Sequence, residues 1–303
     1  MIVKMSLFGG LMILSNYESA FIFDLSWLLY RGFHANSELI ITLPEGGRKP
    51  VGHIFSVLQS LVSASKRNHR AMMIYAVDGV SFRKDYDPTY KQHREKTGFN
   101  VHNDEEEVLN ALMVGGAFTA RGDRLEADDV LFSLAGYLKR KLSGQIRIVS
   151  SDMDLYQALD IRVSMVKSLS KDKMVDFSAQ DVRSKFGVDP EYFYFYKAIT
   201  GDDSDNIRPV IPRFPRKVIK EMGKQGVTED TLDSFVPATK SEQKWIDLLK
   251  EHRGALVHNI NMVKLIKKEV KVSRKGNKPQ AEAFLSRHRM SSYINFLKSR
   301  KLL

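Results

Sequence analysis

Three short apolar runs in the first half of the chain each lead into an aspartate, and this pattern restricts the fold more than any other feature. The runs are 21–23, 72–77 and 146–149, and the aspartates that follow them are Asp24, Asp78 and Asp152. Apolar residues recur at helical spacing over 51–64 and 125–142. Apolar strands that alternate with amphipathic helices are typical of a parallel sheet covered by helices. The sequence therefore predicts an α/β fold with a mainly parallel central sheet.

The second half of the chain is predicted to be mainly helical. Helical patterns extend over residues 178–187, 189–199, 216–222, 241–266 and 281–298. The run KVSRKGNKPQ at 271–280 is polar and basic, so we expect a loop there. These patterns divide the chain into an N-terminal extension (1–20), an α/β core (21–200) and a helical C-terminal region (201–303).

Composition excludes several classes of protein. With 43% hydrophobic and 27% charged residues among 303, the chain has the composition of a globular protein. It lacks cysteine, which excludes disulfides, thiolate zinc sites and cysteine nucleophiles. No phosphate-binding glycine motif for a nucleotide cofactor is present. No apolar run approaches the roughly 20 residues of a membrane span, and the apolar N-terminus has no clear signal-cleavage site. We therefore expect a soluble, cytoplasmic protein without a membrane partner.

The chain carries a net charge of +11, and a basic segment lies between residues 79 and 104. This segment interleaves lysine and arginine with aromatic residues: Phe82, Arg83, Lys84, Tyr86, Tyr90, Lys91, Arg94, Lys96 and Phe99. Basic side chains neutralise phosphates, and aromatic rings stack on unpaired bases. We therefore predict a nucleic-acid ligand, although a merely solvated basic surface would account for the net charge equally well.

Further carboxylates accompany the three strand-end aspartates. They are Glu126, Asp128 and Asp129 at the start of a predicted helix, Asp154, and the aspartates Asp202, Asp203 and Asp205 of the sequence GDDSDN. Each stretch alone is explained by a turn or a helix cap. Together, in a net-positive chain, they predict a site for hard cations, because Mg²⁺ prefers oxygen ligands. Two such ions can activate a water and stabilise the leaving oxygen in phosphodiester hydrolysis.

Five motifs occur in the order and at the spacing of a known family: FDLSWLLYR, AVDG followed by FRK and YKQHR, EADD, SSDMDLYQ and GDDSDN. In these motifs, between about residue 21 and residue 207, the chain resembles the 5′ nuclease (flap endonuclease) superfamily, and within it the ribonuclease H group of T-even-type bacteriophages. The resemblance implies a PIN-like 5′ nuclease core, a helical arch over about 79–107 and a DNA-binding C-terminal region. It also implies a Mg²⁺-dependent 5′→3′ exonuclease and flap endonuclease that removes RNA primers during lagging-strand DNA replication.

The resemblance implies roles for individual residues as well. Two metal ions, Mg²⁺ with Mn²⁺ as a substitute, would be held by Asp24, Asp78, Glu126, Asp128, Asp129, Asp152, Asp154, Asp202 and Asp205. The implied catalytic set is Asp24, Asp78, Lys91, Arg94 and Asp152. In it, Lys91 and Arg94 would grip the scissile phosphate. Arg83 and Lys84 would contact other phosphates, and Tyr90 would stack near the 5′ end.

One segment departs from the family pattern. Many relatives follow GDxSDN with a glycine-rich GIGxKTA segment that holds a monovalent cation against the duplex, whereas this chain has RPVIPRFPRK at 208–217. Close approach of backbone to phosphate favours glycine, so we expect no such cation site and assign duplex contacts to Arg213, Arg216 and Lys217. The implied partners are DNA and RNA–DNA duplexes with 5′ ends or flaps, a sliding clamp and a single-strand-binding protein. A monomer is expected, in the bacterial host cytoplasm if the source is viral.

Two other interpretations stay open. A PIN-type single-strand ribonuclease would share the acidic cluster, but PIN domains are shorter and lack the YKQHR and GDDSDN motifs. A non-catalytic nucleic-acid-binding protein would keep the basic segment, yet acids that repel the DNA backbone serve a purpose only with metal ions. The aromatic run at 192–196 is interpreted as helix packing, and His53 as a structural or a solvated residue.

Overall fold

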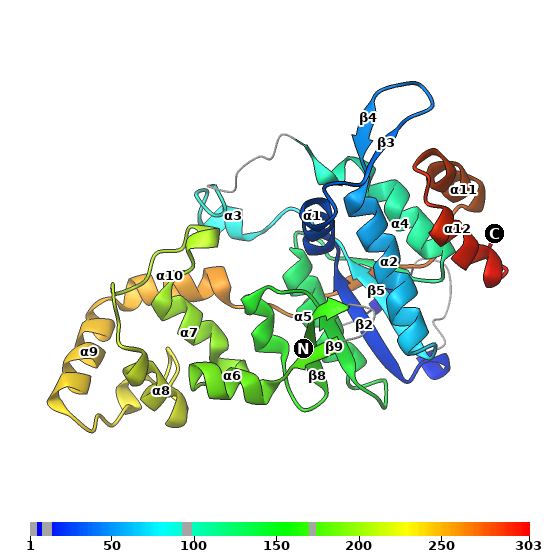
Figure 1. The fold of residues 1–303 in the computed structure, drawn as a ribbon. Coiled ribbons are helices and arrows are strands. Elements are labelled where there is room, and N and C mark those ends of the chain that lie inside the picture. The colour runs from blue at the N-terminus through cyan, green and yellow to red at the C-terminus, as the bar shows by residue number, and fades with distance from the viewer. Residues whose placement is uncertain (1–4, 8–13, 93–98, 170–173) are drawn as a thin grey trace.

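The computed structural model describes residues 5–7, 14–92, 99–169 and 174–303. Figure 1 shows a sheet covered by helices and, beyond one side of it, a group of further helices. This group comprises α6 (Ala179–Phe186), α7 (Phe193–Thr200), α8 (Arg216–Lys224), α9 (Lys240–Glu251) and α10 (Arg253–Val263). In the described ranges, no helix combines the length and the apolar character that crossing a bilayer requires.

The described strands form one large sheet and one small hairpin. The strands of the large sheet, in spatial order, are β1 (Met5–Leu7), β10 (Val270–Ser273), β6 (Phe118–Arg121), β5 (Ala71–Ala76), β2 (Ser19–Asp24), β7 (Ile146–Val149), β8 (Val163–Leu169) and β9 (Met174–Phe177). Neighbours from β6 to β8 are parallel, whereas β10 and β9 pair antiparallel with β6 and β8. The mainly parallel sheet is confirmed. The hairpin, β3 (Ile40–Thr42) and β4 (Arg48–Pro50), projects from the molecule (Figure 1).

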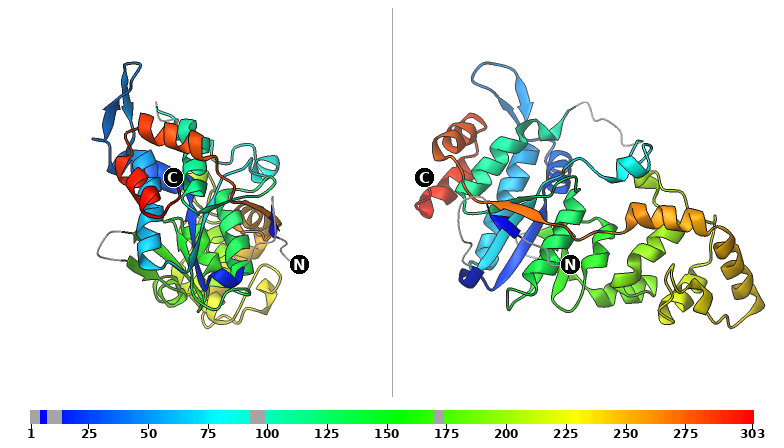
Figure 2. Two further views of the ribbon diagram at one scale, coloured as in Figure 1. Left: turned by 90° about the vertical axis from the view of Figure 1, so that its right-hand side faces the viewer. Right: turned by 180° about the vertical axis from the view of Figure 1, so that it is seen from behind.

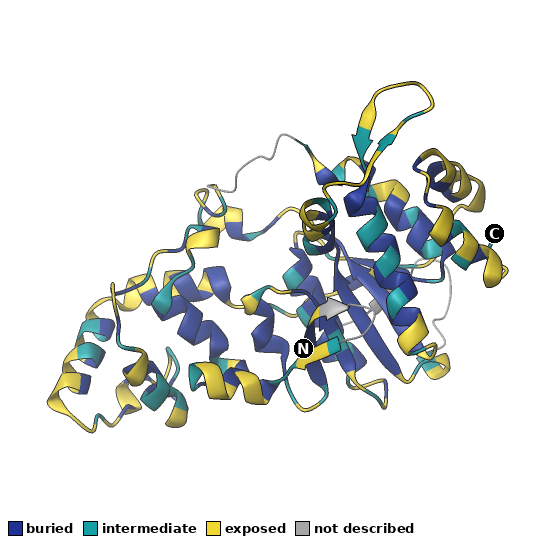
Figure 3. Cartoon of the chain, viewed as in Figure 1, coloured by how far each residue is buried: buried dark blue, intermediate teal, exposed yellow. Residues whose placement is uncertain are grey.

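Helices cover both faces of the sheet, so every residue of β2 and β5 is buried. On one face, Phe23 and Tyr75 stack at 4.4 Å beneath α1 (Leu25–Ala35), α2 (Gly52–Arg67) and α4 (Glu105–Val114). On the other face, Ile22 and Ile74 pack with α5 (Ala127–Leu138). Figure 3 shows the sheet as the buried centre of the molecule. The continuous apolar runs of the sequence are therefore strands that are shielded on both sides.

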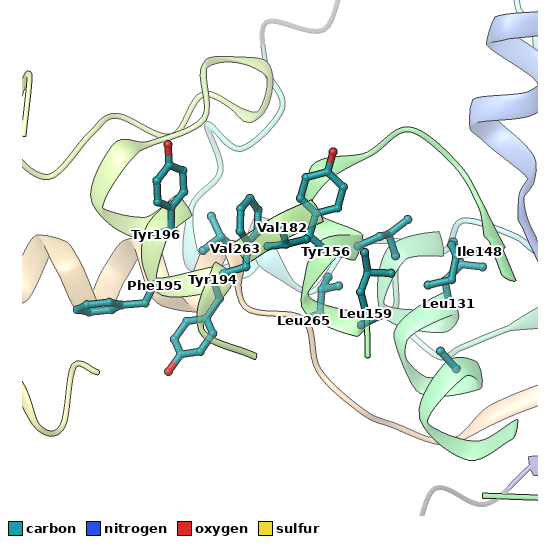
Figure 4. Packing of buried hydrophobic residues seen from close by; sticks show 14 of the residues in the cluster. Leu131, Ile148, Tyr156, Leu159, Val182, Tyr194, Phe195, Tyr196, Val263 and Leu265 are labelled. Atoms are coloured by element: carbon teal, nitrogen blue, oxygen red, sulfur yellow. The ribbon is translucent and has the colours of Figure 1, made fainter. Parts of the chain in front are cut away.

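Local signals in the sequence set the helices that follow the sheet. Ser178 and Asp181 form a capping box at the start of α6, and Gly187 ends that helix at φ 76°. Helix α7, which follows η4 (Pro190–Tyr192), packs against α10. Its aromatic residues are buried, and the Phe193 ring lies 5.2 Å from that of Tyr156. Figure 4 shows Tyr194, Phe195 and Tyr196 in the same hydrophobic cluster as Tyr156. The interpretation of the aromatic run as helix packing is confirmed.

Predictions for the last third of the chain are wrong in three places. The segment 271–280, expected to be a loop, begins inside β10, where Val270 and Val272 are buried and Lys271 is exposed. The alternation of buried and exposed residues is short and lies beside a basic run, so it is too weak to predict a strand from the sequence. The single helices expected over 241–266 and 281–298 are each two helices. The sequence does not reveal these breaks, because the amphipathic period continues through them. The second pair is α11 (Lys278–Arg287) and α12 (Ser291–Ser299).

The end of the chain returns to the sheet instead of staying with α6–α10. After α10, the chain forms β10 beside β6, with β1 as its other neighbour (Figure 2). Helices α11 and α12 then pack against α4 and α2. The region 201–303, expected to be helical, thus also supplies a strand and two helices to the core.

The expected arch, residues 79–107, holds α3 (Arg83–Tyr86), η2 (Val101–Asp104) and the start of α4 in its described part. Residues 93–98, and with them Arg94, lie outside the described residues. Near one end, the Arg83 side chain is buried in the core. Near the other end, Asp104 accepts hydrogen bonds from Lys49 and pairs with the buried His53. Of the two interpretations of His53, the structure supports a structural residue over a solvated one. Both ends of the segment are fixed to the core.

Candidate metal centre

The three strand-end aspartates meet at one edge of the sheet. Asp24 ends β2, Asp78 closely follows β5, and Asp152 closely follows β7. Because β2 pairs in parallel with both β5 and β7, the carboxyl ends of these strands lie side by side. The structure therefore brings together the three carboxylates that the sequence pattern places at the ends of strands.

Hydrogen bonds orient all three carboxylates, and Asp152 Oδ1 accepts from the backbone N–H of Asp154 at 2.9 Å. Asp24 caps α1 by accepting from a backbone N–H of its first turn at 2.9 Å, and its other oxygen accepts from the Ser150 hydroxyl at 2.9 Å. Asp78 accepts from the Ser26 hydroxyl at 2.5 Å and from the first backbone N–H of α5 at 2.7 Å. Sequence reasoning missed Ser26 and Ser150. Their positions beside the aspartates, in FDLS and in SSD, are the signal that could have found them.

Asp128, in the first turn of α5, completes what we call the first acid group: Asp24, Asp78, Asp128 and Asp152. Among the described residues, its Oδ1 is buried without a hydrogen-bond partner. Burial raises the pKa of Asp128 well above its ordinary value, and the charges of Asp152 and Asp24 raise it further. A buried, unpartnered carboxylate oxygen beside other carboxylates fits a divalent cation that takes oxygen ligands.

Asp154, Asp202 and Asp205 form the second acid group, in which one oxygen from each lies within 4.8 Å of the others. Asp202 caps the short helix η5 (Asp203–Asp205) within the GDDSDN turn. The turn requires Gly201, which has φ 74° and whose added Cβ would lie 2.5 Å from the backbone N of Pro209. This group offers only carboxylate oxygens, the donor type that Mg²⁺ and Mn²⁺ accept.

Lys197 is the cation of the second acid group, and sequence reasoning missed it. It lies in α7, and its Nζ is 2.9 Å from Asp154 Oδ1 and bonded to Asp202. Burial and the charge of Asp152 raise the pKa of Asp154 to about 7, although Lys197 opposes the shift. Burial also acts to raise the pKa of Asp202, but Lys197 and a turn hydroxyl hold it below its ordinary value. A lone lysine in the apolar sequence FYFYKAIT is the signal that could have found it.

Two predicted roles are wrong because Arg83 and Asp129 neutralise each other. Arg83 is 2% exposed, and its two Nη atoms donate to the two oxygens of Asp129 at 2.6 and 3.0 Å. Arg83 also donates to the carbonyls of Met262 and Lys264, and Asp129 accepts from the N–H of Ile266. Arg83 therefore cannot contact a substrate phosphate, and Asp129 cannot ligate a metal. Adjacent acids on a helix point about 100° apart, so the EADD motif places Asp128 and Asp129 on different sides.

Tyr90 and Lys91 face the acids. Tyr90 is buried, and its hydroxyl lies 3.0 Å from both Glu126 Oε2 and Asp205 Oδ2. Here the buried ring has no face open to a base, and the stacking role of Tyr90 stays a prediction. Lys91 pairs with Glu126, and its Nζ lies 3.8 Å from Asp205 Oδ2. Burial acts to raise the pKa of Glu126, but Lys91 and Arg83 hold it below its ordinary value.

The remaining predicted nucleic-acid contacts are exposed. Lys84 lies on α3, Arg213 precedes α8, and Arg216 and Lys217 begin α8. Helix α8 starts directly after Pro215, in the segment that stands where many relatives have glycines. These four side chains are accessible to phosphates, and their roles stay predictions.

The metal-free protein is expected to lose stability as the pH rises from about 4 to about 7. Burial, with the charges of Asp78 and Asp152, raises the pKa of Asp24 from 3.8 to about 7, and the pKa of Asp154 is also about 7. The folded state therefore binds more protons than the unfolded state across this interval. The free energy of unfolding that this proton binding contributes is lost as the protons dissociate. Thermal unfolding from pH 5 to pH 8 in EDTA and in Mg²⁺ checks this.

Bound divalent ions replace those protons, so the Tm difference between Mg²⁺ and EDTA should widen with rising pH. Taking this difference removes the contribution of titrating groups elsewhere in the chain. A difference that stays constant or narrows toward pH 8 would show that the acid groups do not carry the pH dependence.

The fold and the site together define a class: an α/β protein with an oxygen-only acid centre at the carboxyl edge of a parallel sheet. The chain belongs to the 5′-3′ exonuclease family, because residues 19–187 match the family's N-terminal resolvase-like domain. It is 30% identical over 209 residues to the thermostable DNA polymerase I of Thermus filiformis, a match that covers 69% of this chain and 24% of that protein. It is 24% identical over 265 residues to the 5′-3′ exonuclease of Aquifex aeolicus, covering 85% and 88% of the two chains.

The chain thus spans about a quarter of the DNA polymerase I relatives but most of the Aquifex exonuclease. Solved structures share its fold. The T5 5′-exonuclease with bound zinc ions has a TM-score of 0.61 and 21% identity, and the match covers 93% and 97% of the two chains. The catalytic core of Rad2 in complex with DNA substrate has a TM-score of 0.56 and 14% identity, covering 97% and 95%. The resemblance to this nuclease family that the motifs indicate is confirmed, whereas the resemblance to the T-even phage group stays a prediction.

Proposed function

We propose that this chain is a divalent-metal-dependent 5′→3′ exonuclease and flap endonuclease, acting near 5′ ends of DNA and RNA–DNA duplexes. The observation that carries the proposal is the acid centre, in which Asp128 Oδ1 is buried without a described partner among the carboxylates of three neighbouring strand ends. Leaving a buried carboxylate unpaired is unfavourable unless a cation joins it. Family membership favours this function over a PIN-type ribonuclease or a non-catalytic binding protein.

Two divalent ions, Mg²⁺ or Mn²⁺, would be held by the two acid groups together with Glu126. When bound, such ions supply an activated water and neutralise charge on the leaving oxygen. The chain's own residues orient the carboxylates: Ser150 holds Asp24, and Ser26 holds Asp78. Because these carboxylates lie at strand ends and at a helix start, they themselves need little rearrangement to take up metal ions.

Nucleic acid would be held by basic residues around this centre. Lys91 and Arg94 would contact the phosphate under attack, which requires Lys91 to leave Glu126. The exposed residues Lys84, Arg213, Arg216 and Lys217 would contact other phosphates. The net charge of +11 supports binding of a polyanion.

The cellular role that we propose is removal of RNA primers from lagging-strand fragments, as a cytoplasmic monomer that works with a sliding clamp and a single-strand-binding protein. Relatedness to DNA polymerase I supports a replication role. Solved T5 and Rad2 structures that contain DNA support nucleic acid as the ligand.

The test uses 5′-labelled nicked and flapped duplexes with RNA or DNA at the 5′ end. We expect short labelled products in Mg²⁺ and none in EDTA. Asp78→Asn should lower the cleavage rate by about 10³-fold. It removes a carboxylate that helps to hold the metal ions, and these ions contribute several kcal/mol of charge stabilisation to the transition state. Asp181→Asn, at the exposed start of α6, is the control and should cleave normally. Binding without cleavage in either Mg²⁺ or Mn²⁺ would refute the proposal.

A further inference from the structure

Lys197 occupies a position that is unusual for a lysine. Every residue of α7 from Phe193 to Ile199 is buried, and Lys197 itself is 3% exposed. Its ammonium reaches the second acid group, where it lies 2.9 Å from Asp154 Oδ1 and bonds to Asp202. Lysine is rarely buried to this extent unless it is paired.

The ammonium cannot easily leave these carboxylates. Its neighbours along α7, from Phe193 to Ile199, are buried, and the N–H of the C-cap residue Gly201 donates to the Lys197 carbonyl. Moving the charge elsewhere within the core would leave it unpaired, which is strongly unfavourable. Lys91 differs, because it lies on the basic segment 79–104 and is 14% exposed.

The charge balance of the two acid groups also differs. In the second group, the buried Lys197 ammonium already serves Asp154 and Asp202, and Lys91 Nζ lies 3.8 Å from the third carboxylate, Asp205. In the first group, the contacts of Asp24 and Asp78 come from hydroxyls and backbone N–H groups, with no lysine or arginine pair to Asp24, Asp78, Asp128 or Asp152 among the described residues. A divalent ion at the second group must therefore share its ligands with a cation that belongs to the chain.

We propose that Lys197 is the resident cation of the second acid group: it holds Asp154 and Asp202 together without metal, and it lowers the affinity of this group for a divalent ion. Lys197 is thus a positioning residue that makes the two acid groups unequal. This inference rests on the proposed function, because it assumes that both groups bind metal during the reaction.

The experiment measures Mn²⁺ binding to the full chain without nucleic acid, by electron paramagnetic resonance of free Mn²⁺, and Tm in EDTA. Lys197→Met removes the charge and keeps the apolar stem. We expect a lower Tm in EDTA and at least about tenfold tighter binding of the weaker Mn²⁺ ion, since a unit charge a few ångströms away is removed. The matched control is Lys139→Met, which breaks an ion pair with Asp160 outside the acid groups and should leave Mn²⁺ binding unchanged.

A second comparison guards against a variant that fails to fold. Lys197→Met is added to Asp202→Asn, so that one positive and one negative charge are removed together. Relative to Asp202→Asn alone, the double variant should still bind the weaker Mn²⁺ ion more tightly. Unchanged or weaker Mn²⁺ binding in this pair, or no binding in any of the proteins, overturns the proposal.

Cleavage of the labelled duplexes is scored separately, so the two ideas can fail independently. If the Mn²⁺ affinities shift as predicted but the wild type does not cleave, the proposed function is refuted and the role of Lys197 as resident cation is retained. Normal Mg²⁺-dependent cleavage with unchanged Mn²⁺ affinities would do the reverse.

Discussion

Replacement of Asp128 by asparagine is expected to abolish metal-dependent cleavage and, at the same time, to stabilise the metal-free protein. The carboxylate has a buried oxygen without a described hydrogen-bond partner, and burial together with Asp152 and Asp24 raises its pKa. Asparagine removes the charge that opposes folding, but it also removes a ligand from the first acid group. We expect a rate at least about 10³-fold lower and a free energy of unfolding in EDTA higher by about 1 kcal/mol at pH 8.

The gain in stability should be smaller at pH 6 than at pH 8, because the pKa of Asp128 is raised, so its carboxyl binds a proton more readily as the pH falls and then resembles the amide. Urea unfolding at both pH values and single-turnover cleavage measure the two effects. Asp123→Asn, an exposed acid in the turn that precedes α5, is the matched control and should change neither quantity. A variant that loses activity and stability together would mean that Asp128 serves the fold and not the metal.

Replacement of Arg83 by methionine is expected to destabilise the protein by about 3–5 kcal/mol, the usual effect of breaking a buried ion pair. Arg83 links Asp129 and Glu126 to the carbonyls of Met262 and Lys264, so its loss leaves two buried acids with fewer partners. It also joins the basic segment to the chain that follows α10.

Urea unfolding again measures this effect, and Lys84→Met is the control, since Lys84 is the exposed neighbour of Arg83 on the same short helix. We expect the control to lie within about 0.5 kcal/mol of the wild type. Equal stabilities for Arg83→Met and the wild type would contradict a structural role and would reopen the possibility of a phosphate contact.

The acid centre carries charges that the fold alone does not need. Asp24 and Asp154 keep pKa values near 7 in the metal-free protein, and Asp128 lacks a described partner for one buried oxygen. The rest of the core obeys the ordinary rules, with apolar strands, capped helices and buried aromatic residues. Such a local departure from good packing rules is what a functional site produces.

Short-range patterns in the sequence were sufficient for the strands that hold the site. An apolar run followed by an aspartate predicts both a buried strand and a carboxylate at its end, so Asp24, Asp78 and Asp152 were found without a structure. Sequence order does not specify how a helix start is rotated. It therefore could not show that Asp128 faces the acids while Asp129 faces Arg83.

The sequence by itself determined the parallel α/β core, the family and the set of acids, because these depend on periods and motifs that are local along the chain. Only the tertiary structure decided which groups pair: Arg83 with Asp129, Lys91 and the Tyr90 hydroxyl with Glu126, and Lys197 with Asp154 and Asp202. Such pairs join residues that are mostly distant in sequence, and their energies depend on burial and separation, which no local pattern records.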